Sequence, residues 1–206
     1  MTPAVVYEDL VLFDASRRGP DVRFLAGVDE AGRGALAGPV VAAAVICEPS
    51  EDLARVRDSK LISEPVRERL YELIMALSLS VGVGIVEPEE IDRSNILRAT
   101  LKAMKAAVEG LEPRPCRVLV DGNHPPGVEP PVETVTGGDR RSFSIAAASI
   151  VAKVTRDRIM RKVDEEFPWY GFVRNKGYGT EYHLEAIARR GLTRIHRRSF
   201  KIHSRS

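Results

Sequence analysis

The chain has 206 residues, which is long enough for one compact domain with a sizeable core. Hydrophobic residues make up 44% and charged residues 29%, a composition that is typical of a globular protein and excludes a disordered one. The longest apolar run, 35–47, contains a glycine and a proline and is too short to cross a bilayer. With two cysteines, no signal peptide and no oligomerisation pattern, we expect a cytoplasmic monomer without membrane contact.

The formal net charge of +2 conceals an uneven distribution of charge. Residues 137–206 hold 16 Lys and Arg against 7 Asp and Glu, whereas residues 1–136 hold 15 against 22. A basic C-terminal region is often only a solvated face, and the alternative is a patch that faces phosphates beside an acidic centre. The small total charge therefore does not exclude a nucleic-acid-binding protein.

Strands dominate the prediction for the first part of the chain. The stretches 24–29 and 39–47 are apolar, rich in β-branched residues and separated by a glycine-rich turn, which predicts a hairpin of buried strands. Ser63 is a predicted N-cap for a helix whose apolar residues recur at helical spacing over 66–77. The stretch 79–86 alternates with period two and predicts a third strand.

The second part of the chain combines two further strands with long helices. Apolar spacing predicts an amphipathic helix over 96–108, and short apolar strands are predicted over 117–121 and 132–135. A long helix is predicted over 142–167 and a last one over 180–190. This pattern favours a mixed α/β sheet with helices on both faces.

Four carboxylates stand beside these predicted elements. Asp29 and Glu30 close an apolar strand, Asp121 closes another, and Asp139 stands at the entry to the long helix. Acids at the ends of neighbouring strands converge at one rim of a sheet. Such a set suits Mg²⁺ or Mn²⁺, and two such ions can hold an attacking water and a leaving oxygen across a phosphodiester. Taken singly, each acid is also explained as a strand-end cap or a helix N-cap.

Other motifs point less clearly to a chemistry. The glycines around Arg33 resemble a dinucleotide-binding loop only faintly, because a strand rather than a helix follows them. The four histidines form no zinc-binding array. Tyr178 lies between two glycines and after a lysine, where it can stack on a sugar or base, or simply be a half-buried loop tyrosine.

The chain resembles bacterial ribonuclease HII over residues 24–200. The segments that carry the resemblance are GVDEAGRGALAGPVVAAAVI (27–46), DSKLISEPVRE (58–68), IDRSNILRATLKAM (91–104), VDGN (120–123), GDRRSFSIAAASIVAKVTRDR (138–158), YGFVRNKGYGT (170–180) and IHRRSF (195–200). The resemblance implies an RNase H-like α/β fold, a mixed five-stranded sheet flanked by helices with a helical C-terminal extension. It also implies three parts: an N-terminal extension 1–23, a catalytic core 24–168 and a basic helical region 169–206 packed on the core.

The implied activity is endonucleolytic cleavage of RNA in RNA–DNA hybrids, and nicking on the 5′ side of single ribonucleotides embedded in duplex DNA. A two-ion site for Mg²⁺ or Mn²⁺ would leave 5′-phosphate and 3′-hydroxyl ends, as ribonucleotide excision repair requires. The implied partners are the hybrid and the ribonucleotide-containing duplex, and a contact with a sliding clamp stays open.

The family's acidic quartet, which is both catalytic and metal-binding, corresponds by position to Asp29, Glu30, Asp121 and Asp139. The implied contacts with nucleic acid are Gly32, Arg33 and Gly34 at the ribose 2′-hydroxyl, the stacking Tyr178, and Lys60 and Arg141. The chain departs from the family at Gly137, where lysine is frequent, and at Arg140-Arg141, where Ala-Lys is frequent.

Two rival functions are weighed against this one. A resolvase-type nuclease of the same fold would act on DNA and be indifferent to a 2′-hydroxyl. A non-catalytic nucleic-acid-binding module would keep its function in EDTA and would not need the four acids.

Overall fold

The computed structural model describes residues 7–56 and 59–202. The first six residues of the expected N-terminal extension, Asp58 of the 58–68 segment and the last four residues of the basic region lie outside the described residues. Within the described ranges, no helix combines the length and the apolar character needed to span a membrane.

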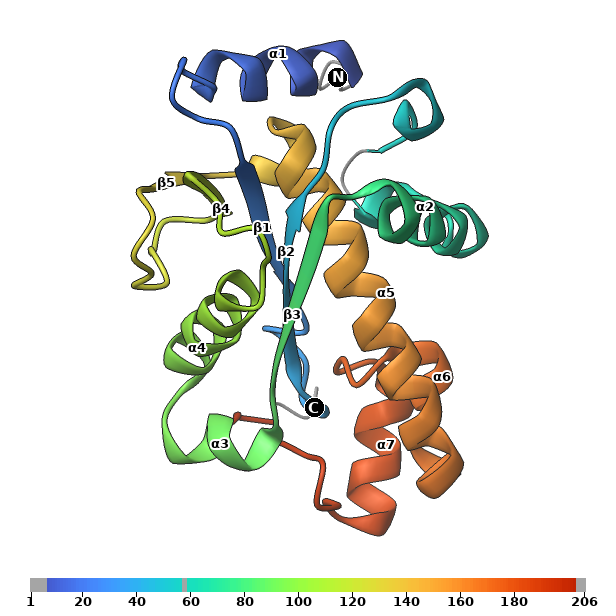
Figure 1. Cartoon of the computed structure of the whole chain (residues 1–206). Helices are drawn as coiled ribbons and strands as arrows, with labels where there is room; N and C mark the ends of the chain where they lie inside the picture. The colour runs from blue at the N-terminus through green and yellow to red at the C-terminus, as the bar shows by residue number, and fades with distance from the viewer. Residues whose placement is uncertain (1–6, 57–58, 203–206) are drawn as a thin grey trace.

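A mixed five-stranded sheet forms the centre of the molecule (Figure 1). Its strands are β1 Leu25–Ala31, β2 Val40–Ile46, β3 Ser80–Val86, β4 Arg117–Asp121 and β5 Val132–Val135. They lie in the order β3-β2-β1-β4-β5, in which β1 is antiparallel to β2 and parallel to β4. β3 is antiparallel to β2, and β5 is parallel to β4. The predicted sheet is thus confirmed strand by strand.

Helices connect and cover these strands. They are α1 Tyr7–Arg17, α2 Glu64–Leu77, α3 Pro88–Arg93, α4 Ile96–Glu109, α5 Phe143–Glu166, α6 Phe172–Asn175 and α7 Glu181–Arg190, with short 3₁₀ turns η1 Glu51–Leu53, η2 Ser59–Leu61, η3 Gly138–Arg140 and η4 Pro168–Tyr170. The four predicted helices appear as α2, α4, α5 and α7. Ser63 precedes α2 as expected, but its side chain makes no capping hydrogen bond.

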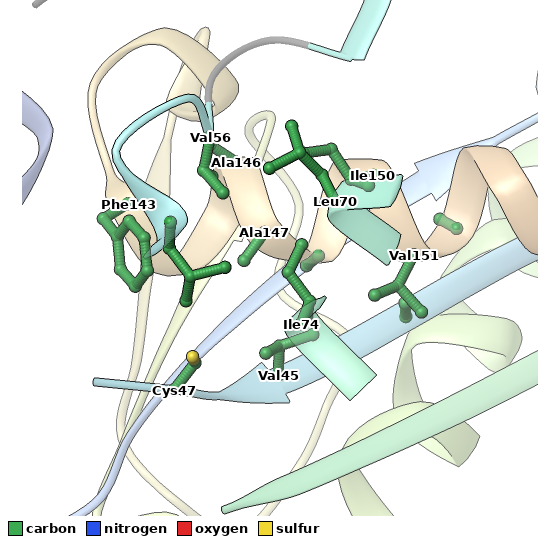
Figure 2. Close-up of a cluster of buried hydrophobic side chains, with 14 of the residues drawn as sticks. Val45, Cys47, Val56, Leu70, Ile74, Phe143, Ala146, Ala147, Ile150 and Val151 are labelled. Carbon is green, nitrogen blue, oxygen red and sulfur yellow. The ribbon is translucent and has the colours of Figure 1, made fainter. Parts of the chain in front are cut away.

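The sheet is covered on both faces (Figure 1). One face packs against α5 and α2, where Val45 meets Leu70, Ile74 and Val151 in the cluster of Figure 2. The other face packs against α4 through small residues of that helix such as Ala103 and Ala107. Both faces need apolar partners, which explains why β2 is buried along its whole length rather than alternating.

Small residues let α5 approach the sheet closely. Its first turns carry Ala146, Ala147 and Ala148, all fully buried. Opposite them, a Cβ atom on Gly27 of β1 would lie 2.0 Å from the backbone carbon of Ser144. The start of α5 is therefore held at a fixed height over β1, and this matters because η3 and Asp139 come just before it.

The C-terminal helices pack on the far half of α5. Met160 of α5 joins Tyr170, Phe172, Ile187 and Ile195 in a separate apolar cluster. Ala37, from the loop between β1 and β2, is part of the same cluster. The region after α5 thus contacts the loop that carries the Gly-Arg-Gly motif, while the boundaries of the three predicted parts of the chain stay a prediction.

Candidate active site

Asp29 and Asp121 lie side by side at the same level of the sheet. The register pairs Val28 of β1 with Val120 of β4, so the next residue on each parallel strand is an aspartate. Asp121 is the last residue of β4, as predicted. β1, in contrast, does not end at Glu30 but continues to Ala31, which corrects the expectation from the sequence. Because β1 continues, the Cβ atoms of Asp29 and Glu30 lie on opposite faces of the strand.

Asp139 is brought to the same place by the 3₁₀ turn η3. The backbone N–H of Gly138 donates to Oδ1 of Asp121 at 2.6 Å, which anchors this turn to the end of β4. The explanation of Asp139 as the helix N-cap is wrong, because α5 is capped by Ser142, whose Oγ accepts from the N–H of Ile145 at 3.2 Å. Asp139 is nevertheless buried, with 6% of its surface exposed. Its carboxylate therefore does not cap α5.

Burial and mutual repulsion together govern the electrostatics of the quartet. Burial, followed by the charges of Glu30 and Asp121 and more weakly Asp139, raises the pKa of Asp29 well above its usual range. The N–H of Glu30, 2.7 Å from Oδ1 of Asp29, offsets only part of this rise. Burial also raises the pKa of Glu30, against the opposing effect of Arg33. Added positive charge beside Asp29 and Glu30 is therefore favoured.

Two cationic side chains stand at the edge of this cluster. The guanidinium of Arg33 lies 3.7 Å from Glu30 Oε1, and Nζ of Lys60 lies 3.6 Å from Asp139 Oδ2. The side chain of Arg33 is 47% exposed and that of Lys60 is 75% exposed, so both reach solvent from the rim of the site. Long, exposed ion pairs of this kind are weak and exchange easily for a phosphate.

The donor chemistry of the quartet fits a hard divalent cation. Its side chains offer only carboxylate oxygens, the ligands that Mg²⁺ and Mn²⁺ prefer. Among residues 7–56 and 59–202, however, no three His, Cys, Asp or Glu side chains are already close enough together to hold a metal ion. The four acids thus form a loose cluster, and their role as metal ligands stays a prediction.

Asp14 of α1 supports the turn that carries Asp139. This aspartate is 2% exposed, and its carboxylate accepts from Ser142 Oγ at 2.6 Å and from the N–H and Oγ of Ser144 at 2.8 and 2.6 Å. A carboxylate at the N-terminus of a helix also complements the helix dipole. A helix from the expected extension therefore fixes the start of α5.

Replacing Asp14 with alanine is expected to lower the free energy of unfolding by about 1–3 kcal/mol, because two buried hydroxyls and one N–H lose their acceptor. Asp9→Ala, which removes an exposed acid from the same helix, is the matched control. Urea unfolding of both variants measures the difference. Equal midpoints would show that Asp14 does not hold α5.

Arg156 of α5 is buried beneath the Gly-Arg-Gly loop. Its guanidinium is fully buried and donates to the carbonyls of Pro39, Lys176 and Ala37 at 2.9, 2.8 and 3.0 Å. Gly32 has a φ of +91°, and a Cβ atom there would lie 1.9 Å from Nε of Arg156. Glycine is needed here both for its backbone conformation and for the space that the guanidinium fills.

Arg197 supports the same loop. It is 1% exposed and donates to the carbonyls of Gly38 and Arg33, both at 3.0 Å. Burial, and next the charge of Arg156, lower the pKa of Arg197 to about 9. Sequence reasoning missed both arginines, although Arg156 shares a helical face with buried Ala152 and Met160, a signal that marks an arginine with a structural role.

Tyr178 lies close to this loop. Its ring centroid is 5.4 Å from the guanidinium carbon of Arg156, which also underlies Gly32, and the residue is 38% exposed. Gly34 is also exposed. Arg141 is exposed at the other end of the site region, with its guanidinium 5.1 Å over the ring of Phe13 on α1. The fold thus gathers Tyr178 with the Gly-Arg-Gly loop, whereas Arg141 stands beside α1.

Comparisons with known proteins agree with this arrangement. The family model Ribonuclease HII matches residues 26–203. A "Ribonuclease HII" from Syntrophus aciditrophicus (strain SB) is 54% identical over 182 residues, which cover 88% of this chain and 86% of that protein. The RNase HII structure in the PCNA complex from Archaeoglobus fulgidus has a TM-score of 0.73 at 27% identity and covers 89% of this chain and 98% of its own.

A structure of Bst-RNase HIII in complex with Mn²⁺ has a TM-score of 0.67 at 19% identity, covers 82% of this chain and 63% of its own, and bears on the fold alone. The expected RNase H-like fold, a mixed five-stranded sheet flanked by helices, is confirmed. Together with the match of the family model over most of the sequence, these findings show that the chain belongs to the ribonuclease HII family and is a ribonuclease H, an endonucleolytic hydrolase.

Proposed function

We propose that this ribonuclease H hydrolyses the RNA strand of RNA–DNA hybrids and nicks on the 5′ side of single ribonucleotides embedded in duplex DNA. The products are 5′-phosphate and 3′-hydroxyl ends, the form that ribonucleotide excision repair can use. The observation that carries the proposal is the buried, mutually repelling set of carboxylates around Asp29, beside a glycine-rich loop and a half-exposed tyrosine.

Asp29, Glu30, Asp121 and Asp139 are the residues that would hold two divalent ions. Bound Mg²⁺ or Mn²⁺ supplies Lewis-acid activation of water and neutralises charge on the phosphate. Burial and, after it, repulsion from Glu30 and Asp121 raise the pKa of Asp29, and this supports the assignment, because added positive charge would relieve the repulsion. Glu30 starts from the opposite face of β1 and is already turned toward a cation, Arg33. Its carboxylate would therefore hold a bound ion from the side of the Gly-Arg-Gly loop.

Lys60 and Arg33 are the expected phosphate contacts nearest to the carboxylates. Each is paired at more than 3.5 Å with a quartet acid, Arg33 at 3.7 Å and Lys60 at 3.6 Å. Because these pairs are long and exposed, the two side chains would be able to turn toward the substrate backbone, whose phosphates dominate affinity for duplexes. The basic region 169–206 would hold the duplex further along in the same way.

The Gly-Arg-Gly loop is the element that we expect to read the 2′-hydroxyl. Gly34 is exposed and has no atom within 4 Å of where a Cβ would lie, so a ribose can approach its backbone closely, while Gly32 allows the loop to turn tightly over Arg156. Arg156 and Arg197 hold this loop rigidly from below. A pre-organised backbone of this kind favours recognition of one hydroxyl group at one position.

Tyr178→Ala is expected to lower kcat/KM on a duplex with one embedded ribonucleotide by about ten- to a hundredfold, because base or sugar stacking contributes about 1–3 kcal/mol. Tyr178→Phe keeps the ring and should stay close to wild type. Steady-state cleavage of a labelled duplex measures both. A Tyr178→Ala enzyme as fast as wild type would remove this residue from the substrate contacts.

The decisive experiment for the whole function maps the cleavage site on one duplex with and without a single ribonucleotide, in Mg²⁺, Mn²⁺ or EDTA. The proposal expects a nick on the 5′ side of the ribonucleotide only, and none in EDTA. Equal cutting of the all-DNA duplex would favour the resolvase-type nuclease. Binding without cutting in any metal would favour the non-catalytic module.

The RNase HII of Archaeoglobus fulgidus is known in a complex with PCNA. For this chain a sliding-clamp contact, the monomeric state and the cytoplasmic location stay predictions.

A further inference from the structure

Two buried histidines form a pair that the proposed chemistry does not use. His183 lies in the first turn of α7 and is fully buried, and His196 follows α7 and is 2% exposed. Their Nε2 atoms are 3.1 Å apart. The pair packs against the stacked rings of Tyr170 and Phe172. The centroid of Tyr170 lies 5.1 Å from that of His196, and the centroid of Phe172 lies 5.2 Å from that of His183. It is thus shielded from solvent within the C-terminal cluster.

The partners at the two ends of the pair determine which nitrogen carries each proton. Nδ1 of His183 lies 2.9 Å from the carbonyl oxygen of Tyr178, which can only accept, so this Nδ1 carries hydrogen. Nδ1 of His196 receives the backbone N–H of Thr193 at 3.0 Å, so it must be the bare nitrogen. In the neutral rings, His196 therefore donates through Nε2 to the bare Nε2 of His183.

The result is a directed relay of hydrogen bonds. It runs from the N–H of Thr193 through His196 and His183 to the carbonyl of Tyr178. Protonation of either ring would disrupt this relay. A proton on Nε2 of His183 would face the N–H of His196, and a proton on Nδ1 of His196 would face the N–H of Thr193. The relay is intact only while both imidazoles are neutral.

Both ends of the relay are joined to the loop between β1 and β2. The backbone of His196 bridges to Ala37, and the N–H of Arg197 donates to the carbonyl of Leu36 at 2.9 Å. On the other side, the carbonyl of Gly177 accepts from Leu36 and Ala37 at 2.8 and 3.2 Å. The segments that carry His196 and Tyr178 thus flank the continuation of the Gly-Arg-Gly loop.

We propose that His183 and His196 are positioning residues, which together fix Tyr178 relative to the Gly32–Gly34 loop through a neutral hydrogen-bond relay. This rests on the proposed function, in which that loop and Tyr178 contact the same ribonucleotide. The relay holds the backbone of Tyr178 while the ring remains half exposed for stacking. Discrimination for the ribonucleotide then depends on two buried groups that touch no substrate.

The surroundings keep the relay neutral. Burial lowers the pKa of His183, and burial together with His183 lowers the pKa of His196 to about 4. The groups that face the pair are the rings of Tyr170 and Phe172, the hydroxyl of Thr193 and the backbone of Tyr178. Among the described residues no carboxylate acts on either ring, and the guanidinium of Arg197 is held by two carbonyls instead.

A pH dependence follows from these directions. Since the unfolded chain binds protons on both histidines near the ordinary pKa of 6.5 and the folded chain does not, stability is present above pH 6.5 and is lost as the pH falls toward 4. The hold on Tyr178 should weaken over the same range.

Nitrogen-15 NMR of the imidazoles tests the relay directly in the wild-type protein. We expect His183 as the Nδ1–H tautomer and His196 as the Nε2–H tautomer, both neutral at pH 6. The opposite tautomer on either ring, or a charged ring at pH 6, would overturn the relay.

Two amide substitutions test its purpose. In His183→Asn the side-chain NH₂ lies where Nδ1 lay, so it can still donate to the carbonyl of Tyr178. In His183→Gln the amide extends toward His196 instead and cannot donate to Tyr178. We expect kcat/KM on the embedded ribonucleotide to fall about threefold for Asn, which keeps the contact with Tyr178 but loses the one with His196, and about tenfold for Gln, mainly through KM. In a Tyr178→Ala background the two variants should cleave equally.

These experiments distinguish failure of the positioning role from failure of the proposed function. Equal rates of the Asn and Gln variants with Tyr178 present, or a difference that persists without Tyr178, would overturn the positioning role alone. A Tyr178→Ala enzyme as active as wild type would instead overturn the proposed role of Tyr178, while the tautomers measured by NMR would still report on the relay.

Discussion

Asp121→Asn is expected to reduce Mg²⁺-dependent cleavage of an RNA–DNA hybrid by about a thousandfold or more while the protein remains folded. A lost carboxylate ligand removes several kcal/mol of transition-state stabilisation, and each 1.36 kcal/mol is a factor of ten in rate. The fold should survive because the asparagine carbonyl can still accept the N–H of Gly138, which now bonds Oδ1 of Asp121 at 2.6 Å.

Single-turnover cleavage, with circular dichroism of the same sample, measures this result. Asp52→Asn, at an exposed carboxylate on η1, is the matched control and should cleave like wild type. Titration with Mn²⁺ should raise the melting temperature of wild type more than that of Asp121→Asn, because a ligand stabilises only the state that binds it. Full Mg²⁺-dependent activity of Asp121→Asn would remove Asp121 from the metal site.

Gly27→Ala is expected to have the largest effect on stability, about 3 kcal/mol or more. The added Cβ would lie 2.0 Å from the backbone carbon and 2.2 Å from the carbonyl oxygen of Ser144, and 2.3 Å from the nitrogen of Ile145. These are backbone atoms at the start of α5, so no side chain can move aside, and overpacking a rigid contact typically costs 1–3 kcal/mol or more. Displacing α5 also shifts η3 and Asp139, so activity should fall as well.

Chemical unfolding compares this variant with Gly19→Ala, where no atom lies within 4 Å of the added Cβ and the residue is exposed. The control should change the free energy of unfolding by less than about 1 kcal/mol in either direction. If Gly27→Ala were as stable as this control, the close contact between β1 and α5 would not be a fixed feature of the fold.

Most secondary-structure elements of the fold can be predicted from local sequence patterns. The strands and the long helix α5 were predicted to within a residue or two, because alternating or helical spacing, and unbroken apolar runs where both faces are buried, can be read along the chain. The short helices α1, α3 and α6 were not predicted. In α1, one of the two buried residues is an aspartate, so the buried face does not look apolar in the sequence.

Some residues of the candidate site were predicted from the sequence and others were not. Asp29 and Asp121 were found as acids beside apolar strands, and their adjacency follows from the pairing of β1 with β4. The buried residues that support the site were not predicted. They are Asp14, which contacts the start of α5 next to η3, and Arg156 and Arg197, which lie beneath the Gly-Arg-Gly loop. Each has partners more than a hundred residues away in sequence, such as Ser142 for Asp14 and Ala37 for Arg156.

The sequence by itself determined the family, the order of the strands along the chain and the acids expected to do the chemistry, because these depend on local composition and on long matched segments. Only the tertiary structure decided that Glu30 lies within a continuing strand, that Tyr178 stands by Gly32, and that His183 and His196 form a directed relay. Those features arise from hydrogen bonds and packing between distant segments. Such contacts leave no periodic signal, since their free energy depends on three-dimensional proximity rather than on neighbours along the chain.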